Sequence, residues 1–215
     1  MPLAAVLWDM DGLLVDTEPV WTVAEEELAL RLGGVWSTEL KARIAGTRLD
    51  VAVPTILEHY GVTATEDAVV EASTWLLDRM VSLFSDGVTP LPGAFELLAG
   101  LEVPVALVSS SYRVLVDAVL HRTGLAFDVT VAGDEVRHGK PDPTPYLTAA
   151  GALGVDPQAC VVLEDSAAGV RAGLSAGCAV VAVPSVPGTT VPADPRCLVR
   201  PSLVGLTGDH LAALV

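Results

Sequence analysis

Two carboxylates one residue apart follow an apolar run near the start of the chain. Residues 3–8 read LAAVLW, and Asp9, Met10, Asp11 and Gly12 come directly after them. An apolar run without polar alternation is typical of a strand that is covered on both faces, as in a parallel sheet. Two charges at the end of a buried strand need a partner, and the simplest partner is a cation.

Polar side chains also follow the later apolar runs. Three serines at 109–111 come after one run, and Glu164 and Asp165 come after another. Lys140 lies in the sequence Gly-Lys-Pro, just ahead of an expected helix. Because ligands of an open parallel sheet bind at the carboxyl ends of its strands, we expect these side chains to lie together at one edge.

Carboxylates, a hydroxyl and an ammonium group at one edge suit magnesium-assisted phosphoryl transfer. Asp9 would be the nucleophile and form an aspartyl-phosphate. Asp11 would be the general acid towards the leaving alcohol and then the general base towards water. Ser109 would donate a hydrogen bond to the phosphoryl oxygens, and Ser110 would contribute its backbone amide. Lys140 would offset negative charge as the transfer proceeds.

The same edge predicts a Mg²⁺ site, because this ion prefers hard oxygen ligands and retains several waters. We expect Asp9, Asp11 and Asp165 to be its protein ligands, with Asp11 acting through its side chain or its main-chain carbonyl. Glu164 is expected beside the ligands, outside the coordination shell itself. Glu164 and Asp165 also qualify as N-capping residues of the next helix, a role that is compatible with metal binding.

The elements that must position these residues follow from periodicity. From residue 87 onward, short apolar runs alternate with amphipathic stretches, which indicates strand–helix–strand units and a doubly wound, Rossmann-like parallel sheet. Strands are expected at 3–8, 103–108, 129–132, 160–163, 179–183 and 197–199, and helices at 94–100, 112–123, 143–153 and 167–176. Asp142 is expected to cap the third of these helices, with Pro143 at its first position.

Residues from about 18 to 85 differ, because they show helical periodicity and no convincing strand. Helices are expected at 25–32, 49–59 and 65–84. We therefore predict two domains: a catalytic core of residues 1–16 and 87–215, and an all-helical cap of residues 17–86 inserted after the first strand.

Composition limits the partners. The formal charge of −15, from 27 acidic and 12 basic residues, disfavours a polyanion such as nucleic acid. No run of about 18 apolar residues is free of interruption, so no membrane span is expected. The three cysteines lack metal-ligand spacing and are expected to be buried, reduced thiols of a cytoplasmic protein. A monomer is the default expectation.

Four short motifs in order carry a family resemblance. Asp9-Met10-Asp11-Gly12, Ser109, the Gly-Lys-Pro at 139–141 and the Glu-Asp-Ser at 164–166 resemble the motifs of the haloacid dehalogenase-like superfamily. This resemblance implies a Rossmann-like core with a helical cap after the first strand. It also implies an aspartate nucleophile, a magnesium cofactor and a small phosphorylated substrate.

Within that superfamily, the DTEPVW stretch at 16–21 and the GTRLD stretch at 46–50 look most like bacterial sugar-phosphate and hexitol-phosphate phosphatases. The related beta-phosphoglucomutases commonly carry a histidine where this chain has Trp21, which disfavours mutase activity. The dehalogenase branch typically lacks the second aspartate that Asp11 provides. The favoured function is hydrolysis of a small phosphomonoester such as a sugar or polyol phosphate.

Other readings stay open at this point. A sugar-phosphate mutase, a signalling receiver domain and a non-catalytic phosphate-binding module share parts of the pattern, although a receiver carries its acceptor aspartate on a later strand. In the cap, Arg48 is either a guanidinium facing the substrate or a solvated residue at a helix start. Glu18 could contact substrate hydroxyls or the cap.

Overall fold

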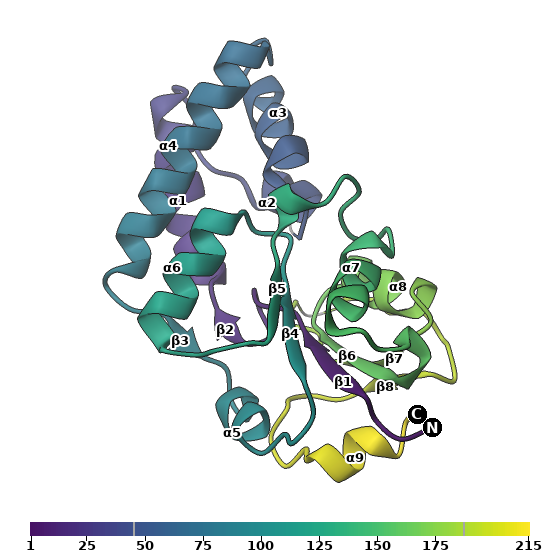
Figure 1. The fold of residues 1–215 in the computed structure, drawn as a ribbon. Helices are drawn as coiled ribbons and strands as arrows, with labels where there is room; N and C mark the ends of the chain where they lie inside the picture. Colours follow the sequence, from purple (N-terminus) through teal and green to yellow (C-terminus); the bar gives the residue numbers. More distant parts are fainter. Residues whose placement is uncertain (45, 187) are drawn as a thin grey trace.

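The computed structural model describes residues 1–44, 46–186 and 188–215, and its centre is a six-stranded parallel sheet (Figure 1). From edge to edge the strands are β5 (Val129–Val131), β4 (Val105–Val108), β1 (Ala5–Trp8), β6 (Cys160–Glu164), β7 (Ala179–Ala182) and β8 (Cys197–Val199). Counted along the core, this order is 3-2-1-4-5-6, the order of a doubly wound Rossmann sheet. The fold class predicted from the sequence is confirmed.

The first strand lies in the middle of this sheet. All four residues of β1 are buried, which explains why the sequence shows an unbroken apolar run there. Trp8 is in register with Leu107 of β4 and with Leu163 of β6. The carboxyl ends of the three central strands are therefore level, and the residues that follow them meet at one edge.

Helices cover both faces of the sheet. On one face, side chains of α5 (Ala94–Ala99), α6 (Arg113–Thr123) and α9 (Gly208–Ala212) share a core with Val6 and Trp8. On the other face, α7 (Thr144–Leu153) and α8 (Ala167–Ser175) pack on Ala5 and Leu7. Figure 1 shows α6 and the α7–α8 pair on opposite sides of the strands. Short 3₁₀ turns lie at Gly133–Glu135 and Pro157–Ala159.

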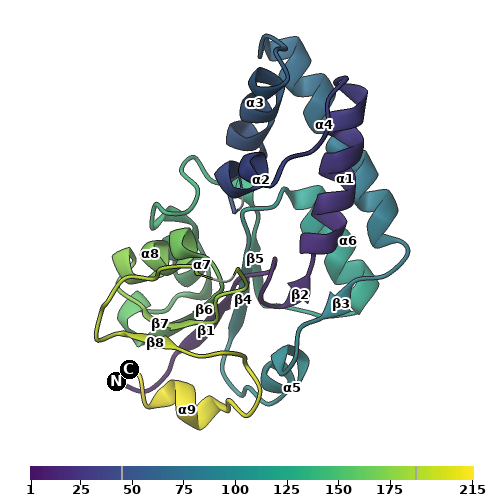
Figure 2. The same cartoon turned by 180° about the vertical axis from the view of Figure 1, so that it is seen from behind.

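A helical segment projects beyond the edge where the strands end. It consists of α1 (Glu18–Arg31), α2 (Thr38–Ile44), α3 (Leu49–His59) and α4 (Glu66–Phe84), and α4 packs against both α1 and α3. Two short antiparallel strands, β2 (Val15–Asp16) and β3 (Thr89–Pro90), pair where the chain leaves and re-enters the core. Figure 2, seen from behind, shows this pair between the sheet and α1.

Several element boundaries differ from the prediction. α1 begins at Glu18 rather than at residue 25, because Pro19 is tolerated in the first turn of a helix. α2, α9 and the β2–β3 pair were not predicted, since elements this short carry too few residues to show a period. α7 begins at Thr144, and the Asp142 carboxylate accepts from the Thr144 amide just before the helix.

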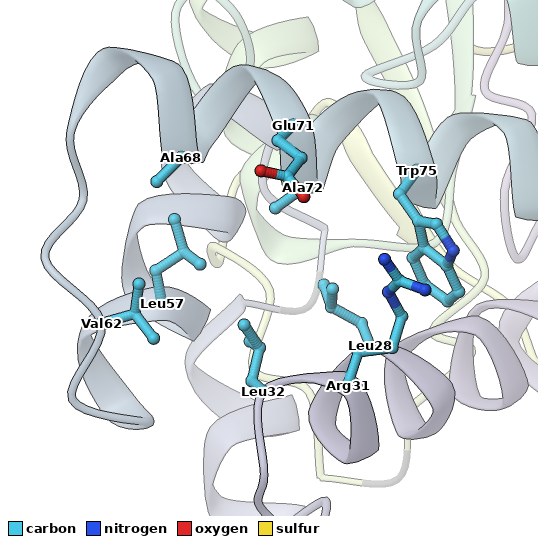
Figure 3. Close-up of a pocket in the computed structure, with 9 residues that line it drawn as sticks. All are labelled: Leu28, Arg31, Leu32, Leu57, Val62, Ala68, Glu71, Ala72 and Trp75. Carbon is cyan, nitrogen blue, oxygen red and sulfur yellow. The ribbon is translucent and has the colours of Figure 1, made fainter.

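A cavity of about 420 Å³ lies within the helical segment, between α1 and α4 (Figure 3). Its walls are mainly apolar, and the Arg31 guanidinium lies over the Trp75 ring, 4.9 Å from the ring centroid. None of the site residues predicted from the sequence lines it. The cavity is therefore separate from the edge where the polar side chains gather.

The three cysteines are free thiols. Cys160 and Cys178 are buried as expected, whereas Cys197 is partly exposed because β8 is the edge strand of the sheet. Among the described residues, no helix combines the length and apolar character needed to span a bilayer.

Candidate active site

Lys140 links the first and fourth strands of the core. Its ammonium group donates to Asp9 Oδ1 at 2.5 Å, to Glu164 Oε1 at 2.6 Å and to the main-chain carbonyl of Val108 at 2.9 Å. An ammonium group has three protons, so each of them has a partner. The side chain is 3% exposed, which places a full positive charge in the interior between two carboxylates.

The Glu164 carboxylate is held from four directions. Besides Lys140, it accepts from the Tyr146 hydroxyl at 2.9 Å, the Ser166 amide at 2.9 Å and the Ser166 hydroxyl at 3.0 Å. Ser166, and neither acidic residue, caps α8, since its hydroxyl accepts from the Gly169 amide. The capping role considered for Glu164 and Asp165 is therefore wrong. A carboxylate with this many donors is fixed in one orientation.

Asp11 faces hydroxyl groups. Its Oδ1 accepts from Thr17 at 2.7 Å, and its Oδ2 accepts from Ser109 at 3.0 Å and Ser111 at 2.9 Å. Thr17 is fully buried and Ser111 is 8% exposed, so these bonds are shielded from water. The Ser111 amide also donates to the Ser109 hydroxyl. The arrangement holds the Asp11 carboxyl firmly at the edge of the sheet.

Oxygen atoms of Asp9, Glu164 and Asp165 lie within 4.8 Å of one another, close enough to hold a metal ion. Asp165 accepts a hydrogen bond from the Ser185 hydroxyl. Gly12 has a φ of +79°, and a methyl group added there would overlap the Asp165 carboxylate. A side chain at position 12 would therefore both strain the backbone and displace a candidate ligand.

The two candidate site residues of the helical segment, Arg48 and Glu18, both have defined partners. Arg48 donates to the Val136 carbonyl at 3.0 Å and to Asp50 at 2.9 Å, and its aliphatic stem packs on Gly139. With 15% of its side chain exposed, Arg48 is not a solvated residue at a helix start, and that alternative is wrong. Glu18 pairs with Lys41 of α2 at 3.1 Å.

Four residues that contact the site residues were not predicted from the sequence: Thr17, Ser111, Tyr146 and Ser185. Ser111 belongs to the serine run already recognised, so that run was a usable signal for it. Tyr146 occupies a helix position that periodicity assigns to the core. No sequence motif shows whether the hydroxyl of a buried tyrosine has a hydrogen-bond partner, so its bond to Glu164 could not be predicted. Thr17 and Ser185 reach the site only through the path of their loops.

Comparison with known proteins matches residues 3–177 to the haloacid dehalogenase-like hydrolase family. The chain belongs to this family.

Among its relatives, hexitol phosphatase A of Escherichia coli is 38% identical over 181 residues, which are 82% of this chain and 81% of the relative. The phosphorylated carbohydrates phosphatase of Thermotoga maritima is 34% identical and covers 81% of this chain and 82% of its own. The protein is accordingly a phosphatase of the haloacid dehalogenase-like family, a phosphoric monoester hydrolase.

A solved structure shares nearly the whole fold. CbbY from Rhodobacter sphaeroides in complex with phosphate superposes with a TM-score of 0.87 at 26% identity, and the match covers 98% of this chain and 99% of that one. A beta-phosphoglucomutase from Clostridium difficile gives a TM-score of 0.84 at 25% identity, over 100% and 97% of the two chains.

Charge in this haloacid dehalogenase-like site is unbalanced. Burial and the neighbouring carboxylates raise the pKa of Asp9 well above its ordinary value, against the effect of Lys140. Burial, with repulsion from Glu164, raises the pKa of Asp165 to about 8. Lys140 counters burial and holds the pKa of Glu164 below its ordinary value. The excess of buried carboxylate oxygens over cationic partners fits a divalent cation beside Asp9 and Asp165.

Substitution of Gly169 on α8 would test how closely the helix packs against the Glu164 carboxylate. A methyl group added at Gly169 would overlap the Glu164 carboxylate, whereas one added at Gly151 on α7 would meet nothing within 4 Å. We expect Gly169→Ala to lower the free energy of unfolding by about 1–3 kcal/mol. We expect Gly151→Ala to raise it by about 0.5–1 kcal/mol, because alanine is the better helix former. Urea unfolding of both variants would check this, and equal effects would contradict it.

Proposed function

We propose that this phosphatase hydrolyses a small phosphomonoester, a sugar or polyol phosphate, with Mg²⁺ and through an aspartyl-phosphate on Asp9. The observation that carries the proposal is the buried Lys140 bridge between Asp9 and Glu164, with Asp165 beside them. The names of the relatives support the substrate class, since two of them are phosphatases of hexitol phosphates and phosphorylated carbohydrates.

In the first step, a carboxylate oxygen of Asp9 attacks phosphorus and the bond to the leaving oxygen breaks. Asp11 gives its proton to that oxygen, so the alcohol leaves neutral. In the second step, Asp11 takes a proton from water while the water oxygen attacks phosphorus, and the bond between phosphorus and the Asp9 oxygen breaks, which releases phosphate and restores the Asp9 carboxylate. Because Asp11 is only two residues after Asp9, its carboxyl group can reach the leaving oxygen in the first step and the water in the second step.

The other groups position the reacting atoms and neutralise negative charge on the phosphoryl group. Lys140 holds Asp9 and places its charge beside the transferring group. The Ser109 hydroxyl, now donating to Asp11, can turn towards a phosphoryl oxygen, with the Ser110 amide beside it. Asp9 and Asp165 would hold Mg²⁺ with the main-chain carbonyl of Asp11, because the Asp11 carboxylate is occupied by hydroxyls. Bound there, the ion would neutralise charge on the phosphoryl oxygens.

We further propose that residues 17–86 form a cap over a core of residues 1–16 and 87–215. The contact of Arg48 with the loop ahead of Lys140 supports a closed position, and the β2–β3 pair is the natural hinge. Closure excludes bulk water before chemistry. Arg48 and Glu18 would then face the part of the substrate away from the reacting phosphate.

Removal of the metal should stop turnover. Phosphate release from a panel of hexitol, hexose, pentose and glycolate phosphates should fall at least about 100-fold with EDTA and return with excess Mg²⁺, because the carboxylates would otherwise repel the phosphate. Release that is indifferent to chelator would contradict the magnesium proposal. A bisphosphate intermediate that is retained and reused would instead show a mutase, the activity of some structural relatives.

Cytoplasmic location and a monomeric state stay predictions from the sequence. The free thiols suit a reducing compartment, and the net charge of −15 disfavours nucleic acid as a partner.

A further inference from the structure

An ion-pair cluster lies on the helical segment beside the site. Lys41 of α2 is 2.8 Å from Glu25 Oε2 and 3.1 Å from Glu18 Oε2, both on α1. The two glutamates are seven positions apart in the sequence, so they lie on the same face of α1, about two turns apart. The exposed fractions of the side chains fall from 40% for Glu18 to 21% for Lys41 and 7% for Glu25. One lysine is thus shared by an outer and an inner carboxylate.

The cluster lies close to the reacting groups along the chain and in space. Glu18 directly follows Thr17, whose hydroxyl donates to Asp11. A methyl group added at Gly46, just past α2, would lie 3.9 Å from Cβ of Ser166 in the core. Figure 1 and Figure 2 both show α2 at the end of the helical segment nearest the sheet. The Glu18–Lys41–Glu25 cluster therefore lies at the end of the helical segment nearest the edge of the sheet where the candidate reacting groups gather.

Two cations at this end of the helical segment already have partners. Lys41 has two carboxylate partners, and Arg48 donates from its two terminal nitrogens to the Val136 carbonyl and to Asp50, while its buried Nε has no partner among the described residues. Arg43 is two residues after Lys41, so it lies on the opposite side of α2, where it is exposed. A second phosphate that approached Lys41 would therefore have to displace a carboxylate from it or lie against the Glu18 carboxylate.

We propose that the Glu18–Lys41–Glu25 cluster is a specificity device that admits a phosphomonoester with an uncharged polyhydroxyl end and rejects a bisphosphate. The inference rests on the proposed function. Glu18 accepts hydrogen bonds from hydroxyls of the substrate, while Glu25 is a positioning residue that holds the Lys41 charge away from a second phosphate. Like charges brought together across an interface disfavour the wrong ligand more than they change affinity for the right one.

Burial of Glu25 sets the pH range in which the cluster is ion-paired. Burial raises the pKa of Glu25 to about 7, with Lys41 acting against that rise. At pH 8 the carboxylate is charged and pairs with Lys41. Assays at that pH therefore test the cluster in its ion-paired form.

The test compares a hexitol 6-phosphate with the corresponding hexitol 1,6-bisphosphate at pH 8 with Mg²⁺. The wild-type protein should have a kcat/KM at least about tenfold higher for the monophosphate. Glu25→Gln should raise relative use of the bisphosphate about tenfold, mainly through a lower KM, because Lys41 is freed. Glu18→Gln, at a more exposed position, should move the ratio in the same direction, and Lys41→Met added to Glu25→Gln should cancel the gain.

Glu27→Gln is the matched control, since Glu27 is on the same helix and its carboxylate pairs with Arg79 at 2.7 Å. It should leave the ratio of the two substrates as in the wild type. Variants at positions 25 and 18 that also leave the ratio unchanged would overturn the inference, as would a wild type that prefers the bisphosphate. If the wild type released phosphate from no phosphomonoester, the proposed function itself would be wrong.

Discussion

Asp9→Asn is expected to reduce phosphate release by about 10⁴-fold or more while the protein stays folded. An amide cannot serve as the nucleophile, so no aspartyl-phosphate forms. The amide oxygen still accepts from Lys140, which keeps its bonds to Glu164 and to the Val108 carbonyl. Steady-state phosphate release and the urea midpoint, measured on the same preparation, would check both parts of this expectation.

Asp67→Asn is a suitable control, because Asp67 is an exposed carboxylate in the first turn of α4. Its activity should stay within about twofold of the wild type, since surface changes away from a site have small effects. An Asp9→Asn protein that keeps substantial turnover would show that another group attacks phosphorus. Mass spectrometry of wild-type protein quenched during turnover should find the added phosphoryl group on the peptide that contains Asp9.

Lys140→Met is expected to lower both stability and activity. The substitution leaves Asp9 and Glu164 buried without their shared counter-charge, and breaking a buried pair in this way costs about 3–5 kcal/mol. Turnover should fall by about 10³-fold, because a preorganised positive charge is lost from the transition state. Unfolding in urea with EDTA present measures the first effect without compensation by a metal ion.

The loss of stability should depend on pH with a definite sign. The pKa of Asp9 is already raised with Lys140 present, and without Lys140 it rises further while the pKa of Glu164 is no longer held below its ordinary value. The folded variant therefore binds more protons than the folded wild type. The variant should therefore lie closer to the wild type at pH 5 and fall further below it as the pH rises to 8. Arg122→Met, at an exposed position on α6, should change the free energy of unfolding by less than about 1 kcal/mol at either pH. A deficit that does not change with pH would contradict this account.

The chain's local pattern determined the sheet and the residues at its edge. Unbroken apolar runs specify strands buried on both faces, and parallel strands must end at a common edge. For that reason Asp9, Ser109, Lys140 and Asp165 could be chosen before their distances were known. Order along the chain also placed the helical segment after the first strand, since its helical period contrasts with the runs around it.

Tertiary structure alone decided which oxygen meets which donor. Asp9 and Lys140 are 131 residues apart, and their contact depends on how α7 packs against the central strands. The same packing buries Tyr146 against Glu164, and the path of the first loop brings Thr17 to Asp11. Side-chain direction at these positions is set by neighbours distant in sequence, whereas periodicity reports only which face is apolar.

The sharing of Lys41 between Glu18 and Glu25 is another contact that only the tertiary structure decided. Sequence spacing puts both glutamates on one face of α1, but nothing in the sequence reports that α2 approaches that face. α2 is seven residues long and follows a turn, so its position is fixed by the burial of Leu40 and Ile44. By itself the sequence determined the family and the fold and indicated the candidate reacting groups, because these follow from local pattern and short motifs. The charge pairing that would select a substrate needed the tertiary structure, since it depends on contacts between separate helices.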